Sequence, residues 1–254
     1  MMNPAEFANI AESEANFWWY RGMREIMFGF LDPLARRRTF GPVLEAGCGT
    51  GHFARELERR YRWRMYSLDL GMEGLRYASE YGLERLAQAD IRRLPYRDQS
   101  FDAVVSMDVI VHLPRGEEAQ PLAEFARVLR PGGLLALRVS ALDILRSRHS
   151  GHAMERQRFT RRRLIDAVRA QGFVVERVTY ANSLLMPVAL AKFRLWEPLT
   201  GQAADSGVKP VAPWLDGLLH APLAAEARWI GAGLGFPVGQ SLILLANAGK
   251  ARPS

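Results

Sequence analysis

The sequence predicts an α/β fold, in which seven short strands alternate with helices and build a largely parallel sheet. Two observations predict this class. Short apolar runs recur between longer amphipathic segments, and this alternation requires helical crossovers between parallel strands. Three glycines at alternate positions, Gly47, Gly49 and Gly51, follow the first apolar run directly. Because ligands bind such sheets beyond the carboxyl ends of the strands, these glycines mark the expected binding edge.

The elements follow in chain order from apolar periodicity and from the glycines, prolines and caps that bound them. The expected strands are residues 42–47, 64–70, 83–90, 100–109, 134–140, 173–182 and 239–248. The expected helices are residues 51–61, 71–82, 116–133, 160–172, 183–200 and 211–232. Pro131 and Gly132 should end the third of these helices, while Thr160 and Gly172 should cap the fourth.

The 254 residues suit a single domain, 1–254, with additions to a central binding core. Residues 1–40 should form an N-terminal helical cap with a broad aromatic face, and residues 43–182 the core. Residues 236–250 carry the final strand. Between the sixth and seventh strands, residues 183–235 form a helical insertion, interpreted as a lid over the binding edge or as packing only.

The composition limits the classes of partner and compartment. The net charge of +7 comes from 31 Arg against 3 Lys in scattered clusters, typical of solvated helix faces, with an anionic substrate or surface as the alternative. The one cysteine, Cys48, excludes an intrachain disulfide and favours a reducing compartment. No leader pattern or apolar run of about 18 residues occurs, so we expect a cytoplasmic protein without a transmembrane span. Peripheral membrane contact, and a monomer or a homodimer, are compatible with this.

The glycine loop differs from the two best-known phosphate-binding loops. Its spacing is G-x-G-x-G, so the third glycine comes one position earlier than in the dinucleotide fingerprint, and the phosphate loop G-x-x-x-x-G-K-[ST] is absent. No basic residue in the loop could meet a pyrophosphate. Glu45 precedes it instead, and a carboxylate there suits a ligand with cationic groups.

Four motifs in order resemble the class I S-adenosylmethionine-dependent methyltransferases, and in particular their type 11 small-molecule group. They are "VLEAGCGTG", "YSLDLG", "QADIRRLPYRDQSFDAVVSMDVIVHL" and "EFARVLRPGGLLAL", and the resemblance extends over residues 43–139. The resemblance implies a Rossmann-like seven-stranded sheet whose last strand is antiparallel. It implies S-adenosyl-L-methionine as cofactor, S-adenosyl-L-homocysteine as product, no metal, and in-line methyl transfer to a small-molecule acceptor. An apolar, lipid-linked or secondary-metabolite acceptor would suit the apolar insertion.

The resemblance also assigns candidate cofactor residues. Asp69, followed by Leu70, should bind the ribose hydroxyls, because a carboxylate can accept from both. Asp90 and the Ile91 amide should meet the adenine, and Glu45 the ammonium group. Gly47, Gly49 and Gly51 should let the main chain pass close to the methionine and ribose portions, with Cys48 in the same loop. Met107 and Asp108 should flank the methionine portion.

Two further groups of residues could complete the site. "FWWYRGMREIM" resembles "HWWF"-like segments that fold over the cofactor in some bacterial members, with Phe17 in place of their histidine. It contributes candidate cap residues, which are Trp19, Tyr20, Arg21 and Arg24, or else packs its aromatic side chains into the core. Three histidines are candidate bases, namely His112, His149 and His152. His149 and His152 lack the further ligands that a metal site would need.

Three alternatives keep part of this interpretation. An RNA methyltransferase would explain the arginines, but no RNA-binding appendage is visible, so no nucleic-acid partner is expected. A non-catalytic regulator would bind S-adenosylmethionine and transfer nothing. An NAD-dependent oxidoreductase would use a related sheet, but the spacing of the glycine loop differs from the dinucleotide fingerprint and argues against this class.

Overall fold

A computed structural model of the chain describes residues 4–146, 154–192, 194 and 211–249. Its sheet has seven strands in the order β3-β2-β1-β4-β5-β7-β6. Their bounds are β1 Pro42–Ala46, β2 Arg64–Asp69, β3 Leu86–Gln88, β4 Phe101–Met107, β5 Leu129–Ser140, β6 Phe173–Ala181 and β7 Ser241–Ala248. The first five strands are parallel, and β7 runs antiparallel between β5 and β6. The predicted fold class is therefore confirmed.

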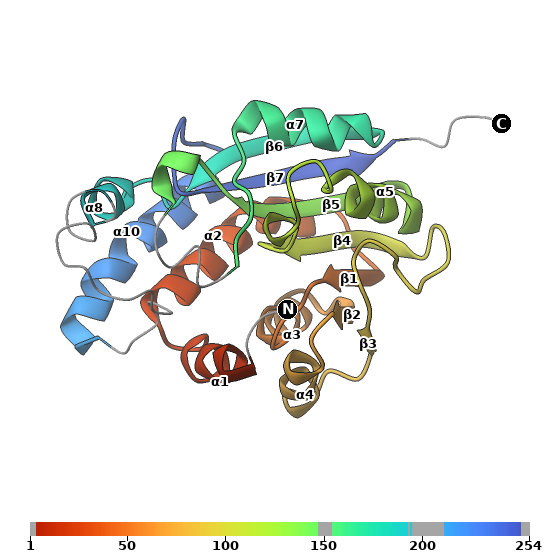
Figure 1. Ribbon diagram of the computed structural model, residues 1–254, viewed down its shortest axis with the longest axis horizontal. Coiled ribbons are helices and arrows are strands. Elements are labelled where there is room, and N and C mark those ends of the chain that lie inside the picture. The colour runs from red at the N-terminus through yellow and green to blue at the C-terminus, as the bar shows by residue number, and fades with distance from the viewer. Residues whose placement is uncertain (1–3, 147–153, 193, 195–210, 250–254) are drawn as a thin grey trace.

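Helices cover both faces of this sheet (Figure 1). Their bounds are α1 Pro4–Ser13, α2 Trp18–Ala35, α3 His52–Tyr61, α4 Met72–Glu80, α5 Ala119–Val128, α7 Arg161–Ala170, α8 Met186–Ala191 and α10 Pro213–Gly231, with the 3₁₀ turns η1 Ile110–His112 and η2 Asp143–Leu145. One core cluster joins the sheet to α5 and α7, and the other joins it to α2, α3 and α10. Strand β1 is buried along its whole length, as a parallel strand covered on both faces should be.

The structure corrects two boundaries. The N-terminal segment is two helices, α1 and α2, separated by residues 14–17. Helix α5 ends at Val128, before the predicted stop at Pro131 and Gly132, which instead belong to β5. A residue that precedes proline disfavours the helical conformation, so Arg130 leaves the helix early. The extended segment then pairs Leu129 with Phe101 before the register shifts.

Helix α10 of the insertion packs along α2. A Cβ on Gly22 would lie 2.4 Å from the Leu223 side chain, so the two helices approach closely at this glycine. Asp216 of α10 accepts from the Trp18 backbone N–H at 2.9 Å and caps the start of α2, where Phe17 has no side-chain acceptor to offer. The described part of the insertion therefore supports α2 as a packing layer. Residues 195–210 of the predicted lid lie outside the described residues.

Candidate active site

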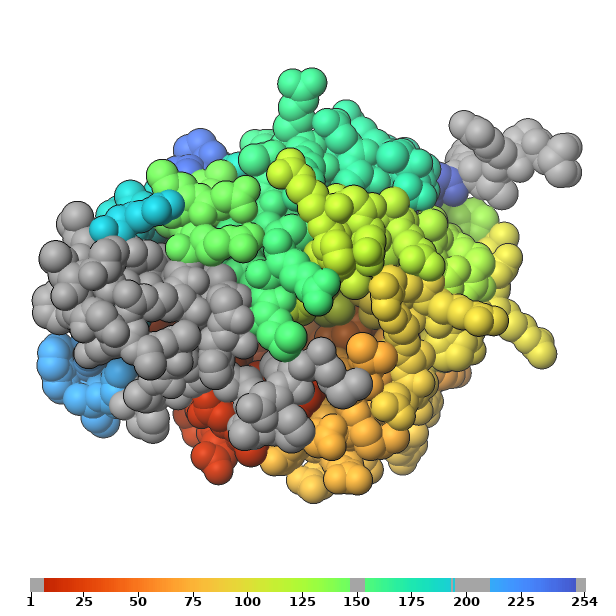
Figure 2. All heavy atoms as spheres, viewed as in Figure 1, coloured from red at the N-terminus to blue at the C-terminus, as the bar shows by residue number. Residues whose placement is uncertain are grey.

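A cavity of about 520 Å³ opens at the carboxyl ends of β1, β2 and β4, between the glycine loop and the helices α1 and α2. The strand order reverses between β1 and β4, so the cavity lies at the switch point that the fold predicts for a ligand. Figure 2 shows the surface hollowed between the orange atoms near residue 70 and the green atoms of the segment after residue 153. Most of the site residues that the sequence indicated line this cavity. They are Trp19, Tyr20, Arg24, Glu45, Gly47, Cys48, Gly49, Asp69, Leu70, Asp90, Ile91, Met107, Asp108 and His112.

The three glycines of the loop have different neighbours, although each has a positive φ. Gly49 lines the cavity, and a Cβ there would meet no atom within 4 Å. A Cβ on Gly47 would lie 2.3 Å from the Val109 side chain. Gly51 does not line the cavity, and its Cβ would lie 2.6 Å from that of Ala78 in α4. Gly49 therefore keeps space open for a ligand, whereas Gly51 permits α3 and α4 to approach.

Asp69 is the last residue of β2, and its carboxylate binds the backbone of two neighbouring segments, the glycine loop and the turn after β2. Its carboxylate accepts from the Gly49 N–H at 2.8 Å and from the Gly71 N–H at 2.8 Å. Because each carboxylate oxygen has two lone pairs, both oxygens can also accept from a ligand. Leu70 follows, lines the cavity and is 48% exposed.

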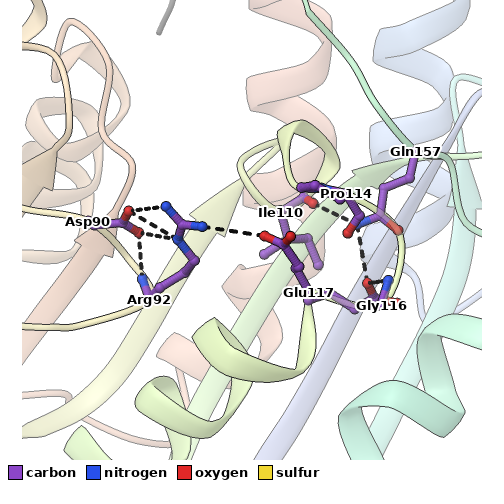
Figure 3. Close-up of polar contacts among 8 residues, drawn as sticks. Asp90, Arg92, Ile110, Pro114, Gly116, Glu117 and Gln157 are labelled. Atoms are coloured by element: carbon purple, nitrogen blue, oxygen red, sulfur yellow. Dashed lines mark hydrogen bonds and ion pairs between the residues drawn. The ribbon is translucent and has the colours of Figure 1, made fainter.

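Asp90 has a strong partner of its own within the loop after β3. Arg92 donates to it from the backbone N–H and from the guanidinium, and also reaches Glu117 at 3.3 Å (Figure 3). These hydrogen bonds from Arg92 hold the pKa of Asp90 below its usual value. Asp90 therefore lies in the cavity wall as an ionised acceptor, which a ligand amino group would share with Arg92. Ile91 next to it is buried.

Two buried carboxylate oxygens in the cavity wall have no hydrogen-bond donor among the described residues. They are Oε2 of Glu45, at the end of β1, and Oδ1 of Asp108, after β4. Burial raises the pKa of Glu45 well above its usual value. The other oxygen of Asp108 pairs with Arg138, and Asp108 itself has φ = 55°, a left-handed conformation that few residues other than glycine adopt. Both orphan oxygens suit a ligand with cationic donors.

The N-terminal cap divides into residues that face the cavity and one that does not. Trp19, Tyr20 and Arg24 of α2 line it, and the Trp19 ring lies 5.4 Å from the Arg138 guanidinium. Arg24 donates to the backbone carbonyls of Glu14 and Ala15, which ties α2 to the end of α1. Arg21 is absent from the cavity wall because it pairs with Asp216 of α10 at 2.7 Å.

Only one of the three candidate bases, His112, lies within the described residues. His112 ends η1 and lines the cavity, with Nδ1 3.4 Å from the Met154 carbonyl oxygen. His149 and His152 lie outside the described residues. Within the described residues, no three His, Cys, Asp or Glu side chains gather closely enough to hold a metal ion. None of the helices described combines the length and hydropathy needed to cross a bilayer.

Sequence reasoning missed that α1 forms part of the cavity wall. Phe7 and Ile10 of α1 line it, as does Glu14 just after the helix, and Phe7 packs against Gly71 and Gly74 beside Asp69. Glu14 is 7% exposed and accepts hydrogen bonds from the Thr50 and Tyr81 hydroxyls. Its burial raises the pKa to about 7. These contacts span 36 to 67 residues of chain, so no local pattern around Glu14 could have indicated them.

Comparison with known proteins matches residues 44–137 to a family model described as a methyltransferase domain, Methyltransf_11. The malonyl-[acyl-carrier protein] O-methyltransferase of Pectobacterium atrosepticum is 40% identical over 98 residues, which are 37% of this chain and 36% of the relative. The fatty-acid O-methyltransferase of Mycolicibacterium smegmatis is 42% identical over 96 residues, which are 36% of this chain and 34% of the relative. The chain thus spans about a third of the length of these relatives.

Solved structures match over nearly the whole chain. A chain in the complex of the Haloferax volcanii Trm112 methyltransferase activator with a methyltransferase has a TM-score of 0.59 at 20% identity, covering 96% of this chain and 98% of that one. A SAM-dependent methyltransferase from Thermotoga maritima has a TM-score of 0.59 at 17% identity, covering 96% and 95%. At these identities the likeness concerns the fold.

Proposed function

Since residues 44–137 belong to the type 11 family of class I methyltransferase domains, we propose that this protein transfers a methyl group from S-adenosylmethionine to a small-molecule acceptor. One observation carries the proposal beyond family membership. Among the residues that the structure describes, two buried carboxylate oxygens of the cavity wall have no donor, one on Glu45 and one on Asp108. A buried acceptor without a donor is destabilising by itself, so a cationic ligand is the natural partner.

The residues of the cavity fit each part of this cofactor. Asp69 would accept from the ribose hydroxyls while it holds Gly49 and Gly71 in place. Glu45 and Asp108 would accept from the ammonium group, and Gly49 leaves room beside them. The remaining proposed contacts are Gly47, Cys48, Leu70, Asp90, Ile91 and Met107, with Trp19, Tyr20 and Arg24 as the cap. Gly51 would act through packing only.

When bound, S-adenosylmethionine supplies a methyl group on a sulfonium sulfur, which is already a good leaving group. The protein's contribution to an in-line displacement is therefore mainly positioning and the exclusion of water. Helices α1 and α2 roof the cavity and would keep water out. A base is required only for an acceptor that must lose a proton. His112 is the described candidate, and we retain His149 and His152 as further ones.

The acceptor that we propose is at least partly apolar. The cavity wall includes Leu113, Met154 and Trp19 as well as His112. Of the relatives named above, one is a fatty-acid O-methyltransferase and the other a malonyl-[acyl-carrier protein] O-methyltransferase. Their names support an acyl or lipid-linked molecule as the acceptor. We also propose that part of residues 183–235 shapes this acceptor site.

The test is calorimetry with S-adenosylhomocysteine on Asp69→Ala. Each hydrogen bond to a charged group contributes about 1.5–3 kcal/mol, so the loss of two should weaken binding by at least about 100-fold. Asp102→Ala is the matched control, because Asp102 accepts from Gly41 N–H at 2.6 Å and lies at the far end of its strand. It should keep the affinity. Equal affinity of Asp69→Ala and the wild type would refute the proposed site.

Three measurements separate the alternatives. Thermal stabilisation by NADH and not by S-adenosylhomocysteine would indicate an oxidoreductase. Binding of the cofactor without turnover on any acyl or apolar acceptor would indicate a regulator. RNA affinity that falls steeply with salt would indicate an RNA methyltransferase, since phosphate contacts release counterions.

A further inference from the structure

Arg156 differs from the other arginines of the cavity wall. The wall contains Arg24, Arg92, Arg138 and Arg156. The first three guanidiniums donate to protein acceptors, namely backbone carbonyls at residues 14 and 15 for Arg24, Asp90 for Arg92 and Asp108 for Arg138. The Arg156 guanidinium has no hydrogen bond or ion pair with any residue that the structure describes, and its side chain is exposed.

The backbone of Arg156 is nevertheless held firmly in place. Its N–H donates to the Val111 carbonyl of η1 at 2.9 Å, and the N–H of Gln157 donates to the same oxygen at 3.1 Å. The buried Gln157 amide donates to the carbonyls of Ile110 and Pro114 (Figure 3). The start of the Arg156 side chain is therefore fixed at the cavity wall, and its guanidinium is available to a ligand.

The neighbouring arginines in the same segment have structural tasks. Arg158 pairs with Glu155 at 2.9 Å, and Arg163 pairs with Glu118 at 2.5 Å. Both of these ion pairs are largely buried. Arg156 is therefore the arginine of "ERQRFTRRR" that lines the cavity.

We infer that the methyl acceptor carries a carboxylate, which Arg156 binds at the rim of the cavity. A guanidinium presents a planar fork of N–H donors that matches the two oxygens of one carboxylate. The apolar groups beside it, Leu113 and Met154, would contact the adjoining carbon chain. The inference rests on the proposed function, because it places the acceptor next to the cofactor cavity.

The experiment uses the full chain saturated with S-adenosylhomocysteine at neutral pH, with octanoate, octanamide and octyl phosphate as probes in calorimetry. The wild type should bind octanoate about 10- to 100-fold more tightly than octanamide, the range expected for charge-assisted hydrogen bonds. Arg156→Met should remove that preference. Arg162→Met is the matched control, because it removes the same charge from a side chain that is 94% exposed on α7, and it should keep the preference.

Each contrary result is distinct. A wild type that binds octanoate no more tightly than octanamide, or an Arg156→Met variant that keeps the preference, overturns the inference. If octyl phosphate binds more tightly than octanoate, and this binding depends on Arg156, the acceptor group is a phosphate and the inference of a carboxylate is overturned. An unchanged thermal transition and unchanged S-adenosylhomocysteine affinity in Arg156→Met show that the variant is folded. If the wild type itself does not bind S-adenosylhomocysteine, the proposed function fails instead.

Discussion

Alanine substitutions at Gly49 and Gly51 should separate the two tasks of the glycine loop. Both glycines have positive φ, +54° and +77°, where an L-residue is less stable by about 1–2 kcal/mol. At Gly51 the new methyl would also lie 2.6 Å from the Ala78 Cβ and 2.8 Å from the Leu83 side chain. Overpacking of this kind typically costs about 1–3 kcal/mol. Gly51→Ala should therefore lower the free energy of unfolding by about 2–5 kcal/mol, and Gly49→Ala by about 1–2 kcal/mol.

Ligand affinity should show the opposite order. The methyl of Gly49→Ala meets no protein atom within 4 Å and would project into the cavity, so S-adenosylhomocysteine should bind at least about 10-fold more weakly. Gly51→Ala leaves the cavity wall unchanged and should keep the affinity within about threefold.

Urea unfolding gives the first quantity and calorimetry on the folded variants gives the second. Each variant is the control for the other, because both make the same chemical change at neighbouring left-handed positions. Equal stabilities of the two variants, or loss of affinity in Gly51→Ala with retention in Gly49→Ala, would refute this assignment of the glycines.

Two further substitutions concern buried carboxylates. Burial raises the pKa of Glu14 from 4.5 to about 7, so the folded state holds this proton more tightly, and the free energy of unfolding should fall by about 3 kcal/mol as the pH rises from about 4.5 to about 7. Urea titrations between pH 5 and 8 should show a smaller fall for Glu14→Gln, and an equal fall would contradict the shift. Glu226 accepts from the N–H groups of Ser183 and Leu184 at 2.7 and 2.6 Å. Glu226→Leu should therefore lower the free energy of unfolding by about 2–6 kcal/mol, and Glu226→Gln by clearly less; equal losses would show that these hydrogen bonds contribute little.

Local sequence patterns were sufficient to predict the strands of the sheet and the residues at their carboxyl ends. Short apolar runs and the glycines and acids that follow them are set by neighbours in the chain, so β1, β2 and β4 and the positions of Gly47, Asp69 and Asp108 could be predicted. The end of α5 could be predicted only in part: Pro131 disfavours a helical conformation at Arg130, but the start of β5 at Leu129 depends on pairing with Phe101, which is 28 residues away.

The N-terminal helices α1 and α2 likewise combine features that the sequence predicted with features that it could not. The aromatic segment of α2 indicated a face over the cavity, and Trp19 and Tyr20 lie there. Arg21 could not be assigned from sequence, because Asp216, which binds it, is 195 residues away. The role of α1 could not be assigned either, since the burial of Glu14 depends on Thr50 and Tyr81.

The sequence by itself determined the α/β class, the binding edge and the acids that face it, because strand and loop signals act over a few residues. The tertiary structure alone decided which charges remain free. It paired Arg21 and Arg138 with carboxylates from distant elements and left Arg156 facing the cavity. The physical reason is that an arginine's task depends on which carboxylates come within a few ångströms, and that is set by the packing of the whole chain.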